Sequence, residues 1–90
     1  MSSDNIENYS LAVTGSDRGI LEISIGGRLN FDTIDKLWDK TTELIEELEP
    51  NKIIIDTKDI EYCDTLGVTY FIKLNKYSTD YGYEYEIINF

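Results

Sequence analysis

Apolar residues occupy every second position over residues 9–13 and again over residues 21–25. A period of two residues is typical of a strand that buries one face. The segment between them contains Gly15-Ser16-Asp17-Arg18-Gly19, and a glycine at each end favours a turn. We therefore predict a hairpin with a five-residue loop over residues 15–19. Gly26-Gly27 is expected to break its second strand.

The period changes to that of a helix after Asn30. Apolar residues and one threonine recur three or four positions apart from Ile34 to Leu48, which predicts a helix with one continuous buried stripe. Asn30 or Asp32 can cap its start. Pro50 is expected to end it, because proline disfavours the helical conformation in the residue before it.

The second half of the chain predicts a strand, a helix and a strand. Residues 52–56 are apolar on both faces, as is typical of a strand in the middle of a covered sheet. We expect a loop over residues 57–63, a helix from residue 64 to about residue 78, and a last strand over residues 83–90. Gly82 lies where a helix often ends in a left-handed residue.

This order of elements, β-β-α-β-α-β, indicates one α/β domain over residues 9–90 after a flexible lead-in over residues 1–8. Each β-α-β unit implies a parallel pair with a right-handed crossover. Both helices should therefore cover the same face of a mixed four-stranded sheet. The opposite face needs polar residues or another cover.

Composition excludes several classes of function. The chain has 90 residues with 18 acidic and 8 basic side chains, a net charge of −10 and no histidine. So few cations disfavour binding to nucleic acid or to an anionic membrane surface. Without histidine, a Ser-His-Asp or Cys-His nucleophile and a histidine-ligated zinc site are impossible. No signal-peptide pattern is visible, and the longest apolar run, Ile53-Ile54-Ile55, is too short to span a membrane, so we expect a cytoplasmic domain without membrane insertion.

Three patterns leave both a structural and a functional interpretation open. The acidic residues of the first helix are a solvated face or a docking face for a basic partner. The second helix carries two apolar stripes, one of which packs on the sheet while the other meets the first helix or a partner. The stripes are Val68-Phe71-Ile72-Asn75 and Leu66-Tyr70-Leu74-Tyr77.

A third pattern is the group of carboxylates at residues 56, 59, 61 and 64, which could hold Mg²⁺ but does not match the spacing of an EF-hand calcium loop. We expect no metal or cofactor there. The single cysteine, Cys63, lacks a cation or histidine that would activate it, so we expect a buried small residue. The tyrosines at positions 81, 83 and 85 are interpreted as turn and strand residues.

Asp64-Thr65-Leu66-Gly67 follows the apolar strand and opens the second helix. Asp64 is a good N-cap, and Thr65 then lies in the first turn with its hydroxyl exposed near unpaired backbone N–H groups. Gly67 is unfavourable inside a helix unless something must approach it closely. Capping alone would account for the pattern.

The strand Ile53–Asp56, the motif Asp64-Thr65-Leu66-Gly67-Val68 and Gly27-Arg28-Leu29 before the first helix resemble the STAS domain, the fold of anti-sigma factor antagonists. The resemblance covers roughly residues 9–90. Domains of this family usually continue past the last strand with a further helix. The sequence ends at Phe90, so either this helix is dispensable or the sequence is part of a longer protein, as the N-terminal domain of a fused permease would be. The surface left bare would favour a homodimer.

The resemblance implies a non-enzymatic module that binds a protein partner. It implies phosphorylation of Thr65 by a partner kinase, and a contact surface formed by Asp64, Thr65, Leu66, Gly67, Val68 and Tyr70. Leu37-Trp38 and the Asp-Thr-x-Gly form of the motif are similar to STAS modules of lipid-transport ABC permeases of the Mla type. We therefore expect an ABC ATPase or permease as partner, with a kinase-type anti-sigma factor as the alternative.

Overall fold

The computed structural model describes residues 9–30 and 33–89. The predictions for residues 1–8, Asp32 and Phe90 lie outside them. The described elements follow the predicted order β-β-α-β-α-β, and no helix follows the last strand within these residues. The elements are β1 (Tyr9–Asp17), β2 (Ile20–Leu29), α1 (Ile34–Leu48), β3 (Lys52–Cys63), α2 (Thr65–Tyr81) and β4 (Glu84–Ile88).

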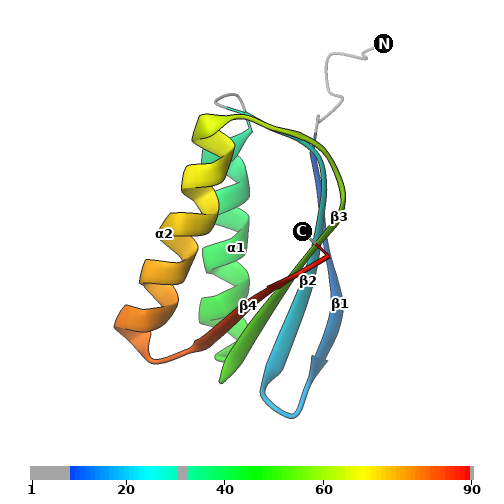
Figure 1. Ribbon diagram of the computed structural model, residues 1–90. Helices are drawn as coiled ribbons and strands as arrows, with labels where there is room; N and C mark the ends of the chain where they lie inside the picture. The colour runs from blue at the N-terminus through cyan, green and yellow to red at the C-terminus, as the bar shows by residue number, and fades with distance from the viewer. Residues whose placement is uncertain (1–8, 31–32, 90) are drawn as a thin grey trace.

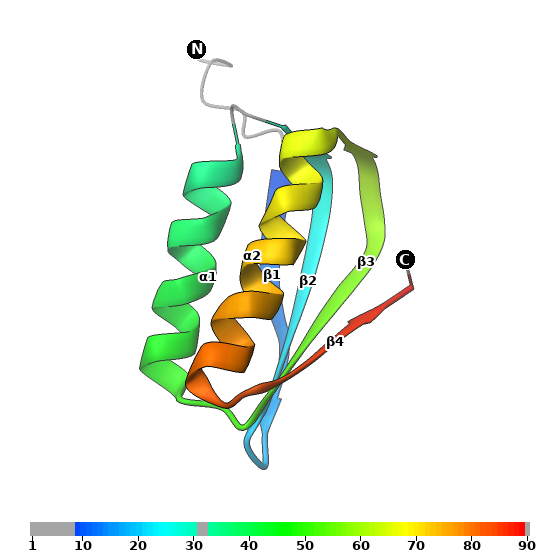
Figure 2. The ribbon, with the colours of Figure 1, turned by 60° about the vertical axis from the view of Figure 1, so that its left-hand side comes forward.

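The strands form one four-stranded sheet in the order β1-β2-β3-β4. β1 runs antiparallel to β2, whereas β2 with β3 and β3 with β4 are parallel pairs. Both helices cover the same face of this sheet, as predicted, and α2 lies beside α1 (Figures 1 and 2). Because β2 and β3 are parallel, both strands finish at the same end of the sheet, and the start of α2 lies there too.

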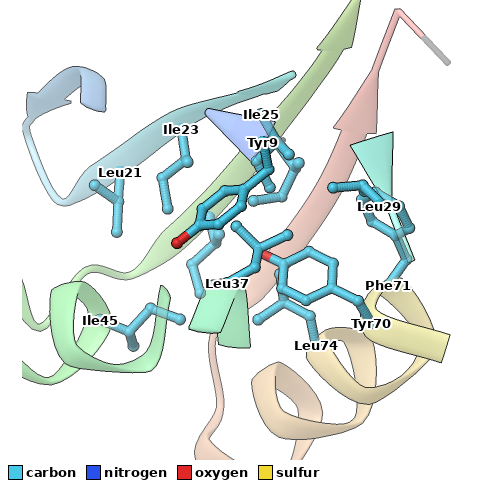
Figure 3. Packing of buried hydrophobic residues seen from close by; sticks show 12 residues of the cluster. Tyr9, Leu21, Ile23, Ile25, Leu29, Leu37, Ile45, Tyr70, Phe71 and Leu74 are labelled. Carbon is cyan, nitrogen blue, oxygen red and sulfur yellow. The ribbon is translucent and has the colours of Figure 1, made fainter. Parts of the chain in front are cut away.

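The core lies between the helices and the sheet (Figure 3). Alternate residues of β2 and β3 point into it, because successive side chains of a strand face opposite sides. Leu21, Ile23, Ile53 and Ile55 are at most 1% exposed. The open face of the sheet carries polar residues such as Lys52, whose ammonium lies 3.0 Å from a carboxylate oxygen of Glu86 on β4.

The hairpin differs from its prediction in both strands. β1 extends to Asp17, so the turn contains only Arg18 and Gly19, both with positive φ, instead of five residues. A bulge between Val13 and Gly15 lets β1 continue through the expected loop. β2 likewise continues through Gly26-Gly27, where two register shifts bend the strand without ending it.

The predicted loop over residues 57–63 is wrong. β3 continues to Cys63 and pairs with the end of β2, with Asp59 beside Gly26 and Cys63 beside Leu29. The sequence of this segment lacks the two-residue period of a strand, because register shifts interrupt its pairing with β2. The pattern therefore did not predict the strand. Gly26 permits the pairing, since a Cβ there would lie 2.9 Å from the Cβ of Asp59.

The helix ends follow the predicted signals in part. Thr33, not Asn30, is the N-cap of α1, and its hydroxyl binds the carbonyl of Arg28 at 3.0 Å rather than a helix N–H. Glu49 ends α1 in a left-handed conformation before Pro50. α2 extends to Tyr81, beyond the predicted end, and Gly82 ends it with φ 81° as expected.

α1 covers one of the two apolar stripes of α2. Tyr70 and Leu74 are fully buried, and the ring of Trp38 lies edge-on to Tyr70 and to Tyr77 with centroid distances of 6.1 and 5.7 Å. The stripe with Leu66, Tyr70, Leu74 and Tyr77 is therefore largely the helix–helix contact. In the other stripe, Phe71 is only 6% exposed and belongs to the core, whereas Ile72 is 63% exposed and stays accessible.

Candidate functional site

Asp64 fixes the start of α2 through three hydrogen bonds. Its carboxylate accepts the backbone N–H of Gly67 at 2.8 Å, and its carbonyl accepts the N–H of Val68 at 2.9 Å. Its own N–H donates to the carbonyl of Leu29 at the end of β2, at 3.1 Å. The predicted N-cap thus joins the first turn of α2 to two strands of the sheet.

Gly67 lies where the helix approaches neighbouring atoms too closely for a side chain. Such a close approach was expected, because glycine is otherwise unfavourable inside a helix. A Cβ at this position would lie 2.5 Å from the carbonyl oxygen of Leu29 and 2.8 Å from the sulfur of Cys63. The helix therefore touches the end of β2 with bare backbone. Cys63 lies partly buried beneath this contact, where burial and the neighbouring Asp64 carboxylate raise the pKa of its thiol.

Thr65 is the first residue of α2 and is exposed to solvent. Its position places the residue at the positive end of the helix dipole, directly after Asp64, whose carboxylate accepts the N–H of Gly67. The residue takes no part in the core, so its side chain is accessible to an enzyme or to a partner.

The residues that follow Thr65 divide between surface and interior. Leu66 is 48% exposed and Val68 is 42% exposed, so both present apolar side chains near Thr65. Gly67 is buried, and its contribution is to position the turn. Tyr70 does not fit the expectation of a contact residue, because it is fully buried and holds α2 against α1.

Two hollows lie beside α2, one on each side of the helix. Their volumes are about 400 Å³ and about 310 Å³. The smaller one lies between the first turns of both helices. The ammonium of Lys73 stands over the Trp38 ring there, 4.7 Å from its centroid. Its lining residues are Ile34, Asp35, Trp38, Leu66, Thr69, Tyr70 and Lys73. Of these, only Leu66 and Tyr70 were predicted from the sequence as contact residues.

The structure does not gather the carboxylates expected near Asp56 into a cation site. Three of them lie along the extended β3 and Asp64 caps α2, and no group of three or more metal-ligating side chains comes together within residues 9–30 and 33–89. Asp56 instead accepts hydrogen bonds from the Asn89 amide and the Lys58 N–H, each at 3.0 Å, and these bonds lower its pKa. It fastens the end of β4 to β3.

The fold and the capped turn after β3 define an α/β domain of a known kind. The model of the STAS domain family matches residues 12–89, so the chain belongs to the STAS domain family. No curated protein sequence shows a significant match to the chain.

Solved structures agree in fold. An anti-sigma factor antagonist from Mycobacterium paratuberculosis superimposes with a TM-score of 0.74 at 15% identity, over 88% of this chain and 65% of that chain. An antisigma-factor antagonist STAS domain from Rhodobacter sphaeroides gives 0.73 at 14% identity, over 89% and 85%. The Bacillus cell fate determinant SpoIIAA in its phosphorylated form gives 0.67 at 15% identity, over 88% and 70%. At such identities the likeness shows the fold.

Neither helix of the described residues combines the length and the apolar character that crossing a membrane requires.

Proposed function

We propose that this chain is a non-enzymatic regulatory module that binds a protein partner through the first turn of α2, and that phosphorylation of Thr65 controls the binding. One observation carries the proposal: Thr65 is exposed directly after the Asp64 cap. Leu66 and Val68, both more than two-fifths exposed, supply apolar contact area beside it. Exposed apolar groups around a modifiable hydroxyl are suited to a switchable contact.

The expected effect of phosphorylation follows from the geometry. A phosphate adds about −1.5 to −2 charges at neutral pH. The helix N-terminus stabilises such a charge, and the cap to Gly67 uses the Asp64 side chain rather than that of Thr65, so the fold should persist. A partner that packs on Leu66 and Val68 would have to desolvate the phosphate or oppose it with its own charges. Phosphorylation should therefore weaken binding without unfolding the domain.

The kind of partner is supported by the relatives. Structures with this fold include anti-sigma factor antagonists, and one of them, SpoIIAA, is described in a phosphorylated form. We infer a kinase-type anti-sigma factor as the partner that fits Thr65 best. The prediction of an Mla-type host depends on Leu37-Trp38 and the Asp-Thr-x-Gly pattern. Trp38 has a packing role between the helices, so it does not favour that host, which stays a prediction.

Affinity capture from the native cell lysate tests the proposal. The baits are the wild-type domain, Thr65→Ala, Thr65→Glu and Thr79→Glu, and bound proteins are identified by mass spectrometry. Thr79 is exposed near the other end of α2, so Thr79→Glu adds the same charge away from the site. We expect a kinase-like anti-sigma factor on every bait except Thr65→Glu.

Other outcomes would change the conclusion. Recovery of an ABC ATPase or permease would place the domain in a transporter. Equal recovery of the kinase-like partner on Thr65→Glu and Thr65→Ala would exclude a charge switch at this residue.

A further inference from the structure

Three tyrosines form an aromatic patch where α2 ends. Tyr77 and Tyr81 lie in the last two turns of α2, and Tyr83 follows its C-cap, Gly82. The ring centroids of Tyr77 and Tyr81 are 4.7 Å apart, and the Tyr83 ring stacks with both at 6.4 Å. Tyr81 is 66% exposed, more than any other large hydrophobic side chain that the structure describes. We call these three tyrosines the tyrosine patch, and its exposure indicates an interaction surface.

The tyrosine patch continues a row of aromatic rings that begins between the helices. The Tyr77 ring meets Trp38 edge-on, and the ammonium of Lys73 stands over the Trp38 ring, 4.7 Å from its centroid. A cation in this position is attracted by the negative face of the ring. Among the described residues no cation stands over the rings of the tyrosine patch. The row thus holds a cation at its inner end and none at its outer end.

The negative ends of both helices lie beside the tyrosine patch. α1 and α2 run side by side in the same direction and finish at the same end of the molecule (Figures 1 and 2). A helix C-terminus favours cations, yet neither helix has a basic residue in its last turn. The end of α1 instead carries Glu46, Glu47 and Glu49. Glu46 lies near Tyr77, since its carboxylate adds to the effect of burial in raising the pKa of that tyrosine.

The ion pairs of the chain leave this negative charge uncompensated. Within residues 9–30 and 33–89 the paired cations use other carboxylates, and no ion pair involves Glu46, Glu47 or Glu49. The pairs are Lys76 with Asp80, Lys52 with Glu86 and Arg18 with Asp17, at 3.2, 3.0 and 3.9 Å. The end of the molecule therefore combines exposed aromatic rings with free carboxylates, and both attract a cation.

We propose that the tyrosine patch binds an arginine-bearing segment of a protein partner, with a guanidinium over Tyr81 and an ion pair to Glu46. A guanidinium is planar and weakly hydrated, so it stacks on an aromatic ring and binds a carboxylate better than an ammonium does. Tyrosine and arginine are also enriched among the residues that dominate protein interfaces. The net charge of −10 disfavours a nucleic acid or an anionic lipid surface as the occupant.

A second copy of the chain fits less well. The chain has two arginines, and Arg28 already stands over the Tyr62 ring, 4.5 Å from its centroid. The other, Arg18, lies beside Asp17, so it brings a negative charge with it. Two copies that each carry a charge of −10 also repel each other. A separate basic segment has none of these disadvantages.

The tyrosine patch would be a second contact surface, distinct from the one at Thr65. Thr65 is the first residue of α2 and Tyr81 is the last. At 1.5 Å per residue, they are about 24 Å apart along the helix axis. A partner could use both surfaces, but each can be tested without the other.

A peptide titration tests the proposal directly. The probe is acetyl-Arg-Gly-Arg-Ser-Arg-Gly-Arg-amide, followed through the amide signals of the isotope-labelled chain at about 0.15 M salt, where charges more than about 8 Å apart are largely screened. We expect saturable shifts confined to the ends of α1 and α2 and to Tyr83. Tyr81→Leu, which removes the ring but keeps an apolar side chain, and Glu46→Gln should each weaken binding about two- to fivefold, and the double variant about tenfold.

Matched control variants make the same changes elsewhere. Tyr62 and Glu61 are an exposed tyrosine and an exposed glutamate on β3, so Tyr62→Leu and Glu61→Gln should bind the peptide as the wild type does. Thr65→Glu should also bind it unchanged. Failure of this proposal can therefore be distinguished from failure of the switch at Thr65.

Two modified peptides separate the components of the interaction. Replacing each arginine by citrulline removes the charge but keeps the planar group, and it should abolish saturable binding. Replacing each arginine by lysine keeps the charge and should weaken binding, because an ammonium cannot stack. Undiminished affinity for either peptide, wild-type affinity of Tyr81→Leu/Glu46→Gln, or an equal loss in Tyr62→Leu/Glu61→Gln would overturn the proposal. Concentration-dependent dimerisation that Tyr81→Leu removes would also overturn it.

Discussion

The hydroxyl groups of Thr41 and Tyr70 lie 2.7 Å apart in the buried contact between α1 and α2. Thr41 Oγ1 also donates to the carbonyl of Leu37 in its own helix at 2.7 Å. Its hydrogen is therefore used, and the Tyr70 hydroxyl donates to Thr41. This bond joins residues 29 positions apart and holds the middle of α2, one turn beyond Gly67, against α1.

The two partners should respond unequally to mutation. Tyr70→Phe leaves Thr41 with its bond to Leu37, so we expect a loss of about 1 kcal/mol in the free energy of unfolding. Thr41→Val leaves the buried Tyr70 hydroxyl without a partner, so we expect about 1 to 3 kcal/mol. The double variant should lose less than the sum of the two, as measured by urea unfolding.

Thr42→Val is the matched control for this cycle. Thr42 is a neighbour on α1 whose hydroxyl binds carbonyls of its own helix only, at 3.0 Å to Trp38 and 3.1 Å to Asp39. Its substitution should change stability by less than about 0.5 kcal/mol. Additive effects of Thr41→Val and Tyr70→Phe would contradict the assigned bond.

Alkaline pH should destabilise the domain. Burial raises the pKa of Tyr70 and of Tyr85, whereas an unfolded tyrosine has a pKa of about 10. The folded state thus binds protons more tightly, and its stability is fully present below about pH 10 and decreases as the pH rises toward the folded-state pKa values. We expect the urea midpoint to fall as the pH rises above about pH 10, and to fall less in Tyr70→Phe/Tyr85→Phe. An equal fall in that variant would assign the effect to other groups.

The cap of α2 predicts a difference between two substitutions of Asp64. Asp64→Ala removes the acceptor for the Gly67 N–H and should cost about 1 kcal/mol in chemical denaturation. Asp64→Asn keeps a capping oxygen and should cost only a few tenths of that. If both variants lost the same stability, the charge rather than the cap would be responsible.

A methyl group at Gly67 should be poorly tolerated. It would lie 2.5 Å from the Leu29 carbonyl, so Gly67→Ala must displace α2 from the end of β2, at about 1 to 3 kcal/mol. Gly15→Ala is the control, because its nearest neighbour would be a side-chain carbon of Glu22 at 3.7 Å. We expect thermal unfolding to separate the two, and equal transition temperatures would refute the close approach.

The sequence predicted which helices and strands form more accurately than it predicted where each begins and ends. Strict alternation identified β1 and β2, and the continuous stripe identified α1, because each has one buried face. The extension of β3 to Cys63 could not be read from the pattern, since register shifts opposite Gly26 and Gly27 interrupt the alternation. The apolar excess of α2 was visible, but which stripe meets α1 depended on packing between Trp38 and Tyr70.

The candidate site was predictable where it is local. The cap by Asp64, the exposure of Thr65 and the close approach at Gly67 all follow from the order of residues in one turn. Tyr70 was misjudged as a contact residue, because a sequence motif does not show which residues lie beneath it. The hollow that includes Asp35 and Lys73 depends on how the two helices are placed relative to each other. The sequence of neither helix alone indicates it.

The most direct measurement is the affinity of purified proteins for the captured partner. Dissociation constants are compared by calorimetry for the wild-type domain, for the domain phosphorylated at Thr65 and for Thr79→Glu, with amide spectra to confirm that each remains folded. We predict that the wild type and Thr79→Glu bind alike, and that the phosphorylated domain binds at least about a hundredfold more weakly, equivalent to about 2.7 kcal/mol. Equal affinity of the folded phosphorylated and unphosphorylated domains would contradict a switch at Thr65.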